Sequence, residues 1–335
     1  MADWDSAQDA RPVDPATLRA LGQVRASSPG ELDKAVRAAD GAQRGDWPVD
    51  AKMRQRLLWR WADLLERDAD ELVEALVAQS GKPVREARVE VAGAVDALRY
   101  NAGLTRLVNG RAGGLPDGSQ AHLVREPVGV TAHIVPWNWP LLLLLRDLAP
   151  ALAAGVTALV KPAPQTTLVT EQAVRLAHEA GIDDDVVSVV VGDDLVGNAL
   201  VTHPLVRAVA FTGSTPVGAA IRAAAAPDMT RTLLELGGKA SLTVFADADV
   251  DGAAEAAARA AVLTAGQHCM ACTRLLVQRG AFVRVRDRAV DVLRTLHIGD
   301  PRDARTDVGP LISAPALTRF NGYVTLARTS ATLLT

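Results

Sequence analysis

Two cysteines are the residues of this chain whose type and spacing most directly suggest chemistry. Cys269 and Cys272 stand three residues apart in the segment Gly-Gln-His-Cys-Met-Ala-Cys. A thiol there could be a redox partner, half of a zinc site or a small buried apolar side chain. No second cysteine pair follows for zinc, and Thr273 stands where a c-type haem attachment requires histidine. The spacing leaves a reactive cysteine and a buried structural one as alternatives.

A lone carboxylate, Glu235, lies between Leu234 and Leu236 and precedes a Gly-Gly-Lys segment. Burying a carboxylate is unfavourable unless it is paired or neutral, so a buried Glu235 would have a raised pKa and could act as a general base. The two glycines would let a substrate approach the backbone closely. The alternative is a glutamate on the exposed face of a short strand.

Two further motifs follow apolar stretches that we interpret as strands. The proline-flanked loop at 136–140 contains Asn138, whose amide could stabilise an oxyanion or could only close a turn between two tryptophans. Lys161 follows the next apolar stretch, where its amine could meet a phosphate, a ribose or solvent. Open α/β sheets bind ligands at the carboxyl ends of their strands, which favours a ligand site at both positions.

The segment at 211–218, Phe-Thr-Gly-Ser-Thr-Pro-Val-Gly, joins a predicted strand to a predicted helix. Backbone N–H groups and the helix dipole at such a junction favour a phosphate. The segment matches neither the G-x-G-x-x-G pattern nor a Walker loop, so an ordinary glycine turn remains an equal alternative.

The elements that must position these residues alternate between strand and helix from residue 129 onward. The predicted strands are 129–135, 156–160, 186–191 and 206–211, and the predicted helices are 141–154, 170–180 and 194–203. Such alternation indicates βαβ units, and the Val- and Ala-rich strands suit a sheet that is covered on both faces. The pattern predicts an α/β fold with a doubly wound parallel sheet.

The flanking regions carry helices and a second, smaller α/β unit. We expect helices that begin after Ser28, whose spacing to Glu31 is that of a capping box, and over 51–80 and 84–104. The glycine-rich segment at 110–118 predicts a hairpin. The second unit is expected to contain strands at 241–245 and 274–277 and helices at 250–265 and 281–296.

Composition narrows the class of function. The 335 residues suit about two domains. The net charge of −3 gives no basic field, which argues against a nucleic-acid partner. The longest apolar run, 141–145, is far shorter than the roughly 20 residues of a membrane span. The two thiols suit a reducing compartment and the first residues show no secretory signal, so we expect a cytoplasmic protein without a membrane partner.

Taken in order, these motifs resemble those of the aldehyde dehydrogenase family. The matching segments are 126–130, 136–140, 161–163, 211–215, 235–239, 266–274 and 309–312. The Glu-Leu-Gly-Gly-Lys motif followed by Gly-Gln-x-Cys is a specific combination. The resemblance covers nearly the whole chain, from about residue 11 to the end.

The resemblance implies oxidation of an aldehyde to a carboxylic acid with NAD, with NADP possible. Cys269 would add to the carbonyl carbon as a thiohemiacetal and then carry an acyl thioester. The Asn138 amide and the Cys269 backbone N–H would hold the oxyanion, and Glu235 would activate the hydrolytic water. Because relatives that transfer the acyl group to coenzyme A generally lack this glutamate, the resemblance disfavours that reaction.

The resemblance also implies a cofactor site on a Rossmann variant. The residues expected to bind the cofactor are Ile134, Val135, Pro136, Trp137, Lys161, Gly192, Gly197, Gly213, Ser214, Gly218 and Leu236. Among them, Lys161 would bond the adenosine ribose, and Gly213 with Ser214 would receive the pyrophosphate. Pro164 stands where many NAD-preferring members carry a glutamate that would repel a 2′-phosphate, which leaves NAD and NADP open; of the two we favour NAD.

By the same resemblance, residues 1–236 form an NAD(P)-binding domain, interrupted by an oligomerisation hairpin near 109–128. Residues 237–335 form a catalytic domain. Family members form homodimers or homotetramers and continue beyond the equivalent of Thr335 with a cofactor-binding Glu-x-Phe-Gly-Pro segment and an assembly strand. We therefore expect a catalytic domain that is incomplete at its C-terminus, a doubtful assembly, and a non-catalytic dinucleotide-binding fragment as the alternative function.

Overall fold

The computed structural model describes residues 8–335, which divide into two compact units. Unit 1 contains the chain up to Pro12, Gly22–Leu72 and Val89–Glu235, and unit 2 contains Val13–Leu21, Val73–Arg88 and Leu236–Thr335. The main division lies next to the expected domain boundary at 236, and unit 2 takes two further segments from the first part of the chain. The assignment of cofactor binding and catalysis to separate domains remains a prediction.

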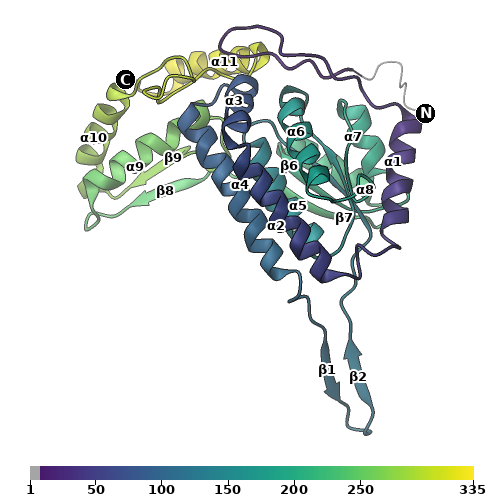
Figure 1. The fold of residues 1–335 in the computed structure, drawn as a ribbon. Coiled ribbons are helices and arrows are strands. Elements are labelled where there is room, and N and C mark those ends of the chain that lie inside the picture. Colours follow the sequence, from purple (N-terminus) through teal and green to yellow (C-terminus); the bar gives the residue numbers. More distant parts are fainter. Residues whose placement is uncertain (1–7) are drawn as a thin grey trace. The chain divides into compact units, whose positions relative to one another are not determined.

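Unit 1 is built on a five-stranded sheet in the order β5-β4-β3-β6-β7 (Figure 1). The strands are β3 (Val130–Ile134), β4 (Ala158–Lys161), β5 (Val187–Val189), β6 (Val206–Gly213) and β7 (Arg231–Leu236). The pairs β3–β4, β3–β6 and β4–β5 are parallel. The order runs outward from β3 to β5 and then reverses to β6, which confirms the predicted doubly wound parallel sheet.

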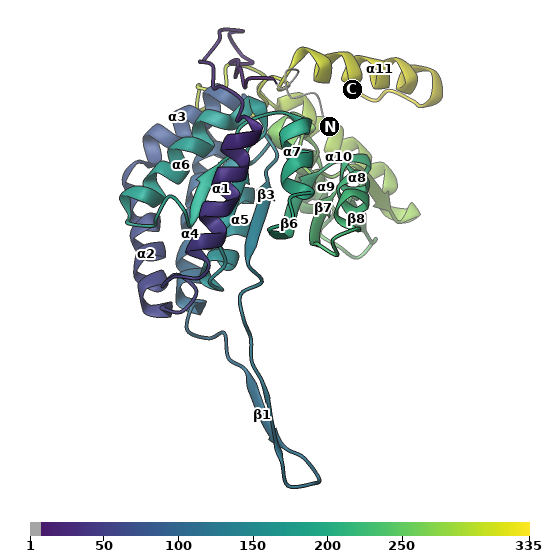
Figure 2. The ribbon, with the colours of Figure 1, turned by 90° about the vertical axis from the view of Figure 1, so that its right-hand side faces the viewer.

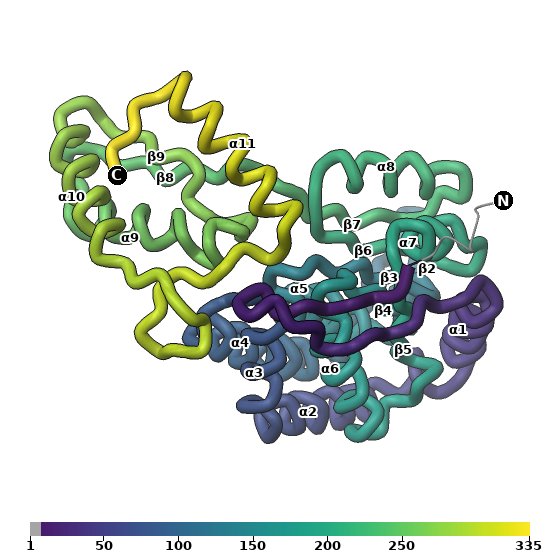
Figure 3. The backbone as a smooth tube through the Cα atoms, turned by 90° about the horizontal axis from the view of Figure 1, so that it is seen from above, coloured from purple at the N-terminus to yellow at the C-terminus, as the bar shows by residue number. Residues whose placement is uncertain are grey.

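Helices cover both faces of this sheet, which accounts for the burial of β3 and β4. The helices of unit 1 that pack around it are α1 (Pro29–Ala42), α2 (Ala51–Arg67), α5 (Pro140–Ala153), α6 (Thr167–Glu179), α7 (Asp194–Val201) and α8 (Thr215–Ala225). Helices α5 and α6 pack with α2, whereas α7 packs with α8. Figure 3 shows α5 and α6 on one side of the sheet and α1 on the other. The short 3₁₀ turn η2 (Pro164–Thr166) follows β4.

The predicted single helix over 51–80 is wrong, because the structure divides it into α2 and α3 (Ala69–Ser80). Asp68 ends α2 with φ −97° and ψ 22°. Its carboxylate pairs with Arg67 at 2.6 Å, and its carbonyl accepts the N–H of Leu72 as α3 begins. Aspartate competes for backbone hydrogen bonds and favours helix ends over helix interiors, which accounts for the break.

The other elements before β3 follow the sequence more closely. The Ser28–Glu31 capping box is present at the start of α1, and α4 spans Val84–Leu104 as expected. The hairpin of β1 (Arg111–Gly114) and β2 (Gln120–Leu123) is antiparallel, and every residue of both strands is exposed. Figures 1 and 2 show it extending away from the rest of unit 1. Its role in oligomerisation remains a prediction.

Unit 2 contains a parallel pair of strands, β8 (Ser241–Val244) and β9 (Arg274–Val277). Helices α9 (Val250–Val262) and α10 (Phe282–Thr295) pack on each other, and the 3₁₀ turn η4 (Arg279–Ala281) precedes α10. A small apolar core joins these elements and contains Val244, Val250, Ala254, Ala281 and Val285. The predicted elements of this unit are therefore confirmed, apart from the end of α9.

Two features of unit 2 differ from the sequence expectation. Helix α9 ends at Val262 rather than 265, because Thr264 and Ala265 adopt left-handed φ values of 50° and 56° in the turn η3 (Leu263–Gly266). Helix α11 (Ala314–Ser330) was not predicted. It has no buried residue, so its apolar side chains do not produce the one-sided pattern that identifies a core-facing helix.

Candidate functional site

The carboxyl ends of β3, β4 and β6 lie side by side where the strand order of the sheet reverses. Ile134 pairs with Lys161 on β4 and with Phe211 on β6, and the Val135 N–H donates to the Lys161 carbonyl at 3.0 Å. In doubly wound sheets this reversal point is where ligands bind. The sheet therefore brings together the expected site residues at 134–138, Lys161 and the loop that begins at Gly213.

Lys161 is the most unusual side chain at this edge of unit 1. It is only 5% exposed, and burial lowers the pKa of its amine, although Asp193 and Asp194 oppose the shift. Among residues 8–335 its ammonium group donates one hydrogen bond, to the Pro162 carbonyl at 3.4 Å. An ammonium group carries three N–H donors, so this amine can donate further hydrogen bonds to the hydroxyl or phosphate oxygens of a ligand.

Glycines shape the backbone around this lysine and in the neighbouring loops. A methyl group at Gly197 on α7 would lie 3.4 Å from Lys161 Cε, so the two residues are neighbours in unit 1. A methyl group at Gly192 would lie 2.3 Å from Val196 Cγ2, and Gly192 has φ 150°. A methyl group at Gly213 would lie 2.4 Å from the Phe211 ring. At these two positions any larger residue would displace a neighbouring side chain.

The expected phosphate loop enters α8 directly after β6. Ser214 is the N-cap residue, its side chain makes no capping hydrogen bond, and its carbonyl accepts the N–H of the buried Gly218. The first N–H groups of α8 therefore lie at an exposed helix terminus.

The loop that contains Asn138 is held at both ends. Val135 and Trp139 are buried, and Asn138 is half-buried with its Oδ1 accepting the Trp139 N–H at 3.0 Å. Buried Glu90 on α4 accepts the N–H groups of Leu141 at 2.8 Å and Leu142 at 3.2 Å. The carboxylate thereby caps the start of α5. The sequence analysis missed Glu90, which is recognisable only by its position on the buried side of α4.

A second residue that the sequence analysis missed is His133, which lies beneath this loop. A cavity of about 10 Å³ is lined by His133, Asp147 and Thr212 among others, and its volume is close to that of one water molecule. Arg146 on α5 reaches Asp147 at 2.8 Å and Thr212 Oγ1 at 2.9 Å. The bond from Arg146 to Thr212 joins α5 to the end of β6, next to the loop that begins at Gly213.

Cys269 lies in unit 2 on an exposed turn, so the interpretation of it as a small buried side chain is wrong. His268 shapes this turn, since its Nδ1 accepts the Met270 N–H at 3.0 Å and its carbonyl accepts the Ala271 N–H at 3.1 Å. Cys272 is half-buried, and its Sγ lies 3.7 Å from the Arg274 carbonyl oxygen. The two thiols therefore have different surroundings.

Glu235 lies near the end of β7 and is exposed, which agrees with the alternative of a glutamate on the exposed face of a short strand and excludes a buried carboxylate. The strand alternates between exposed and half-buried residues, and Leu236 is on the half-buried face. In unit 2, the Lys239 carbonyl accepts the Arg274 Nε–H at 2.9 Å, and Thr273 Oγ1 donates to the Ala240 carbonyl at 3.0 Å. The Gly-Gly-Lys segment is thereby fixed to the chain that follows Cys272.

These observations define a doubly wound α/β protein whose strand ends carry a buried lysine and tight glycine loops, and whose second unit presents an exposed thiol. The sequence model of the aldehyde dehydrogenase family matches residues 3–335. The chain belongs to the aldehyde dehydrogenase family. No helix within residues 8–335 combines the length and the apolar character that crossing a lipid bilayer requires.

Known relatives are 36–38% identical to this chain over the aligned residues. The hydroxyisobutyraldehyde dehydrogenase of Mycolicibacterium austroafricanum is 38% identical over 324 residues, which cover 96% of this chain and 64% of the relative. A probable NADP(+) succinate-semialdehyde dehydrogenase of Sinorhizobium fredii is 36% identical and is covered to 64%, with 92% of this chain aligned. The crystal structure of an NAD-dependent aldehyde dehydrogenase from Sinorhizobium meliloti has a TM-score of 0.93 at 37% identity, covering 98% of this chain and 66% of that one. The chain thus spans less than two thirds of the length of these two curated relatives.

Proposed function

We propose that this chain oxidises an aldehyde to a carboxylic acid with NAD, or with NADP, through a covalent bond to Cys269. The observation that carries the proposal is the exposed Cys269 on a turn that is fixed by hydrogen bonds, in a chain of the aldehyde dehydrogenase family. A thiolate is the nucleophile that such a reaction requires, and it must be reachable by the substrate.

In the proposed reaction the Cys269 thiolate attacks the carbonyl carbon, and the carbonyl oxygen takes the negative charge. The Asn138 amide and the Cys269 backbone N–H are the donors for this oxyanion, and donors of this kind typically contribute about 3–4 kcal/mol each. The Asn138 Oδ1 already accepts the Trp139 N–H, which orients the amide so that its NH₂ group is the donor the role requires. The product of the attack is a thiohemiacetal.

The residues at the strand ends of unit 1 fit a dinucleotide. Lys161 has further donors for ribose hydroxyls, and a side chain at Gly192 or Gly213 would displace Val196 or Phe211 and so change the loops proposed to bind the cofactor. Ser214 begins the helix that would receive the pyrophosphate. A bound nicotinamide supplies the acceptance of a hydride. Pro164 in η2 provides no carboxylate that would repel the 2′-phosphate of NADP. We therefore propose NAD as the cofactor and expect NADP to be accepted as well.

Departure of the hydride leaves an acyl thioester on Cys269 Sγ. A thioester is reactive enough for water to displace the thiolate, which restores the free cysteine. Glu235 is proposed to take the proton of that water, and its exposed position lets it exchange the proton with solvent.

The test is aldehyde-dependent formation of NADH or NADPH by the wild-type chain, measured by absorbance over a panel of aldehydes. Cys269→Ala should abolish turnover, while Cys272→Ala, the matched control three residues away, should retain it. Turnover that survives Cys269→Ala would refute the proposal.

A second candidate function is binding of the dinucleotide without turnover, for which the strand-end residues of unit 1, with the buried Lys161 and the tight glycine loops, would suffice. It predicts that NADH binds to the wild-type chain and to variants that keep Lys161, such as Cys269→Ala, while no aldehyde is converted to product.

We also propose that the β1–β2 hairpin joins copies of the chain into a homodimer or homotetramer. Replacing residues 111–123 by a short Gly-Ser linker should then lower the mass in solution.

A further inference from the structure

Three consecutive residues in the left-handed backbone region directly precede the turn of Cys269. The φ values are 50° for Thr264, 56° for Ala265 and 76° for Gly266. Only the glycine adopts this region without a steric penalty, so the other two must be held by their surroundings. The question is which contacts hold Thr264 and Ala265 there.

Thr264 is contacted by Glu86, which stands 178 residues earlier in the chain. Both oxygens of its carboxylate accept the Thr264 N–H, at 3.0 and 3.2 Å, and one of them also accepts the Thr264 hydroxyl at 2.8 Å. Glu86 is only 6% exposed, and burial raises its pKa while the hydrogen bonds from Thr264 oppose the shift. Burying a carboxylate costs desolvation free energy, and the hydrogen bonds to Thr264 offset part of that cost. These same bonds hold Thr264 in its left-handed conformation.

Further bonds extend from Thr264 towards the cysteines. The Thr264 carbonyl accepts the Gln267 side-chain amide at 3.0 Å, and the Oε1 of Gln267 accepts the Ile312 N–H at 3.0 Å. The Cys272 N–H donates to the Ala260 carbonyl at 3.2 Å. The segment between Thr264 and Cys272 is therefore anchored at both ends, and Glu86 holds the first end.

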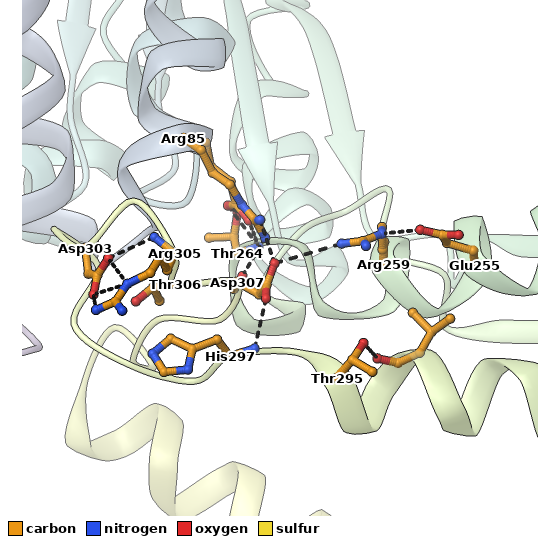
Figure 4. A network of polar contacts seen from close by, with 12 residues as sticks. Arg85, Glu255, Arg259, Thr264, Thr295, His297, Asp303, Arg305, Thr306 and Asp307 are labelled. Carbon is orange, nitrogen blue, oxygen red and sulfur yellow. Dashed lines mark hydrogen bonds and ion pairs between the residues drawn. The ribbon is translucent and has the colours of Figure 1, made fainter.

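The start of α4, which carries Glu86, is itself fixed within unit 2. Figure 4 shows Arg85 pointing at Asp307, whose carboxylate lies 2.6 Å from the guanidinium. The same carboxylate accepts the His297 N–H at 2.8 Å, and the Val84 N–H donates to the Pro301 carbonyl at 2.8 Å. Glu86 is thus presented to Thr264 from an anchored helix start.

We infer that Glu86 is a positioning residue that holds the left-handed segment 264–266 and so sets the geometry of the Cys269 turn. This inference rests on the proposed function, in which Cys269 is the nucleophile. Glu86 does not touch the reacting atoms, and its effect passes through Thr264. The hydroxyl and the N–H of Thr264 are the groups through which it acts.

The test compares the alkylation of Cys269 and Cys272 by iodoacetamide in the same molecule, site by site, by peptide mass spectrometry over a range of pH. Cys272 is the internal reference, and this readout needs no aldehyde turnover. Glu86→Gln removes an acceptor from Thr264, and Thr264→Val removes the hydroxyl alone. Thr264→Ser keeps both groups. Glu90→Gln is the matched control, since Glu90 is also buried on α4 and accepts two backbone N–H groups.

Glu86→Gln and Thr264→Val should each change the ratio of the Cys269 to Cys272 rates at least about threefold, and the double variant should change it no further than Glu86→Gln. Thr264→Ser should retain the wild-type ratio of the two alkylation rates. Glu90→Gln should also leave this ratio unchanged, even if the substitution lowers the melting temperature. Where turnover is measured, Glu86→Gln should lower kcat about tenfold or more with KM little changed.

An unchanged ratio in Glu86→Gln, or an equal change in Glu90→Gln, would overturn the inference. If Glu86→Gln does not fold, the contrast between Thr264→Val and Thr264→Ser decides in the same way. The two proposals fail separately. Turnover that survives Cys269→Ala removes the proposed function, while the alkylation ratio still reports on Glu86.

Discussion

Acidification should destabilise this protein through His133, a histidine that is buried beneath the Asn138 loop. Its side chain is 3% exposed, its Nδ1 has no hydrogen-bond partner within residues 8–335, and burial lowers its pKa to about 4 against the opposing charge of Asp147. In the unfolded chain the same ring titrates near 6.5. Between these values the unfolded state binds more protons than the folded state, so the free energy of unfolding falls as the pH falls.

The size of the effect follows from the separation of the two pKa values. It corresponds to about 3 kcal/mol of stability that is present at neutral pH and is lost as the pH falls from about 6.5 to about 4. Urea unfolding of the wild type and of His133→Leu at a series of pH values isolates this contribution, because the other titrating groups are common to both proteins. The stability of the leucine variant relative to the wild type should rise by about that amount on acidification. If the difference in the free energy of unfolding between the two proteins stays constant with pH, His133 does not cause the acid sensitivity.

Three further predictions test other parts of the account. Lys161→Met should raise the Kd for NADH about tenfold or more, measured by the fluorescence of the bound nucleotide, because a hydrogen-bonded ammonium is removed; an unchanged Kd would take this lysine out of the cofactor site. Gly309→Ala should lower the free energy of unfolding by more than about 2 kcal/mol, since the new methyl group would lie 2.1 Å from the Gly81 backbone oxygen; an unchanged urea midpoint would contradict the packing described. Asp307→Ala should cost about 1–3 kcal/mol in the same assay, because it removes the acceptor of the His297 N–H and the partner of Arg85; a loss below about 0.5 kcal/mol would show that the network contributes little.

The parallel sheet was predictable because its signal is local. The segments around Val130–Ile134 and Ala158–Lys161 are short and rich in apolar residues and are separated by helices, a pattern typical of a sheet covered on both faces. The positions of Lys161 and of the loop after β6 followed from the strand ends. The places of these residues at the strand ends could therefore be predicted, while their binding of a cofactor stays a prediction.

The features that the sequence did not reveal depend on distant partners. The left-handed turn at Thr264 is stabilised by a glutamate far away in the chain, and no local pattern distinguishes it from a continued helix. Likewise, the burial of His133 and the exposure of Glu235 depend on which faces of their strands are covered. The break at Asp68 was a weak local signal that the apolar periodicity on both sides concealed.

In the proposed reaction Cys269 carries the acyl group before water releases it. The most direct measurement is peptide mass spectrometry of the Glu235→Gln variant, quenched in acid after incubation with NAD and an aldehyde that the wild type oxidises. Because loss of the Glu235 carboxylate slows hydrolysis of the thioester, we expect an acyl group on the peptide of Cys269 and none on Cys272. Product formation by the wild type with no adduct on Cys269 in this variant, or an adduct on Cys272, would contradict it.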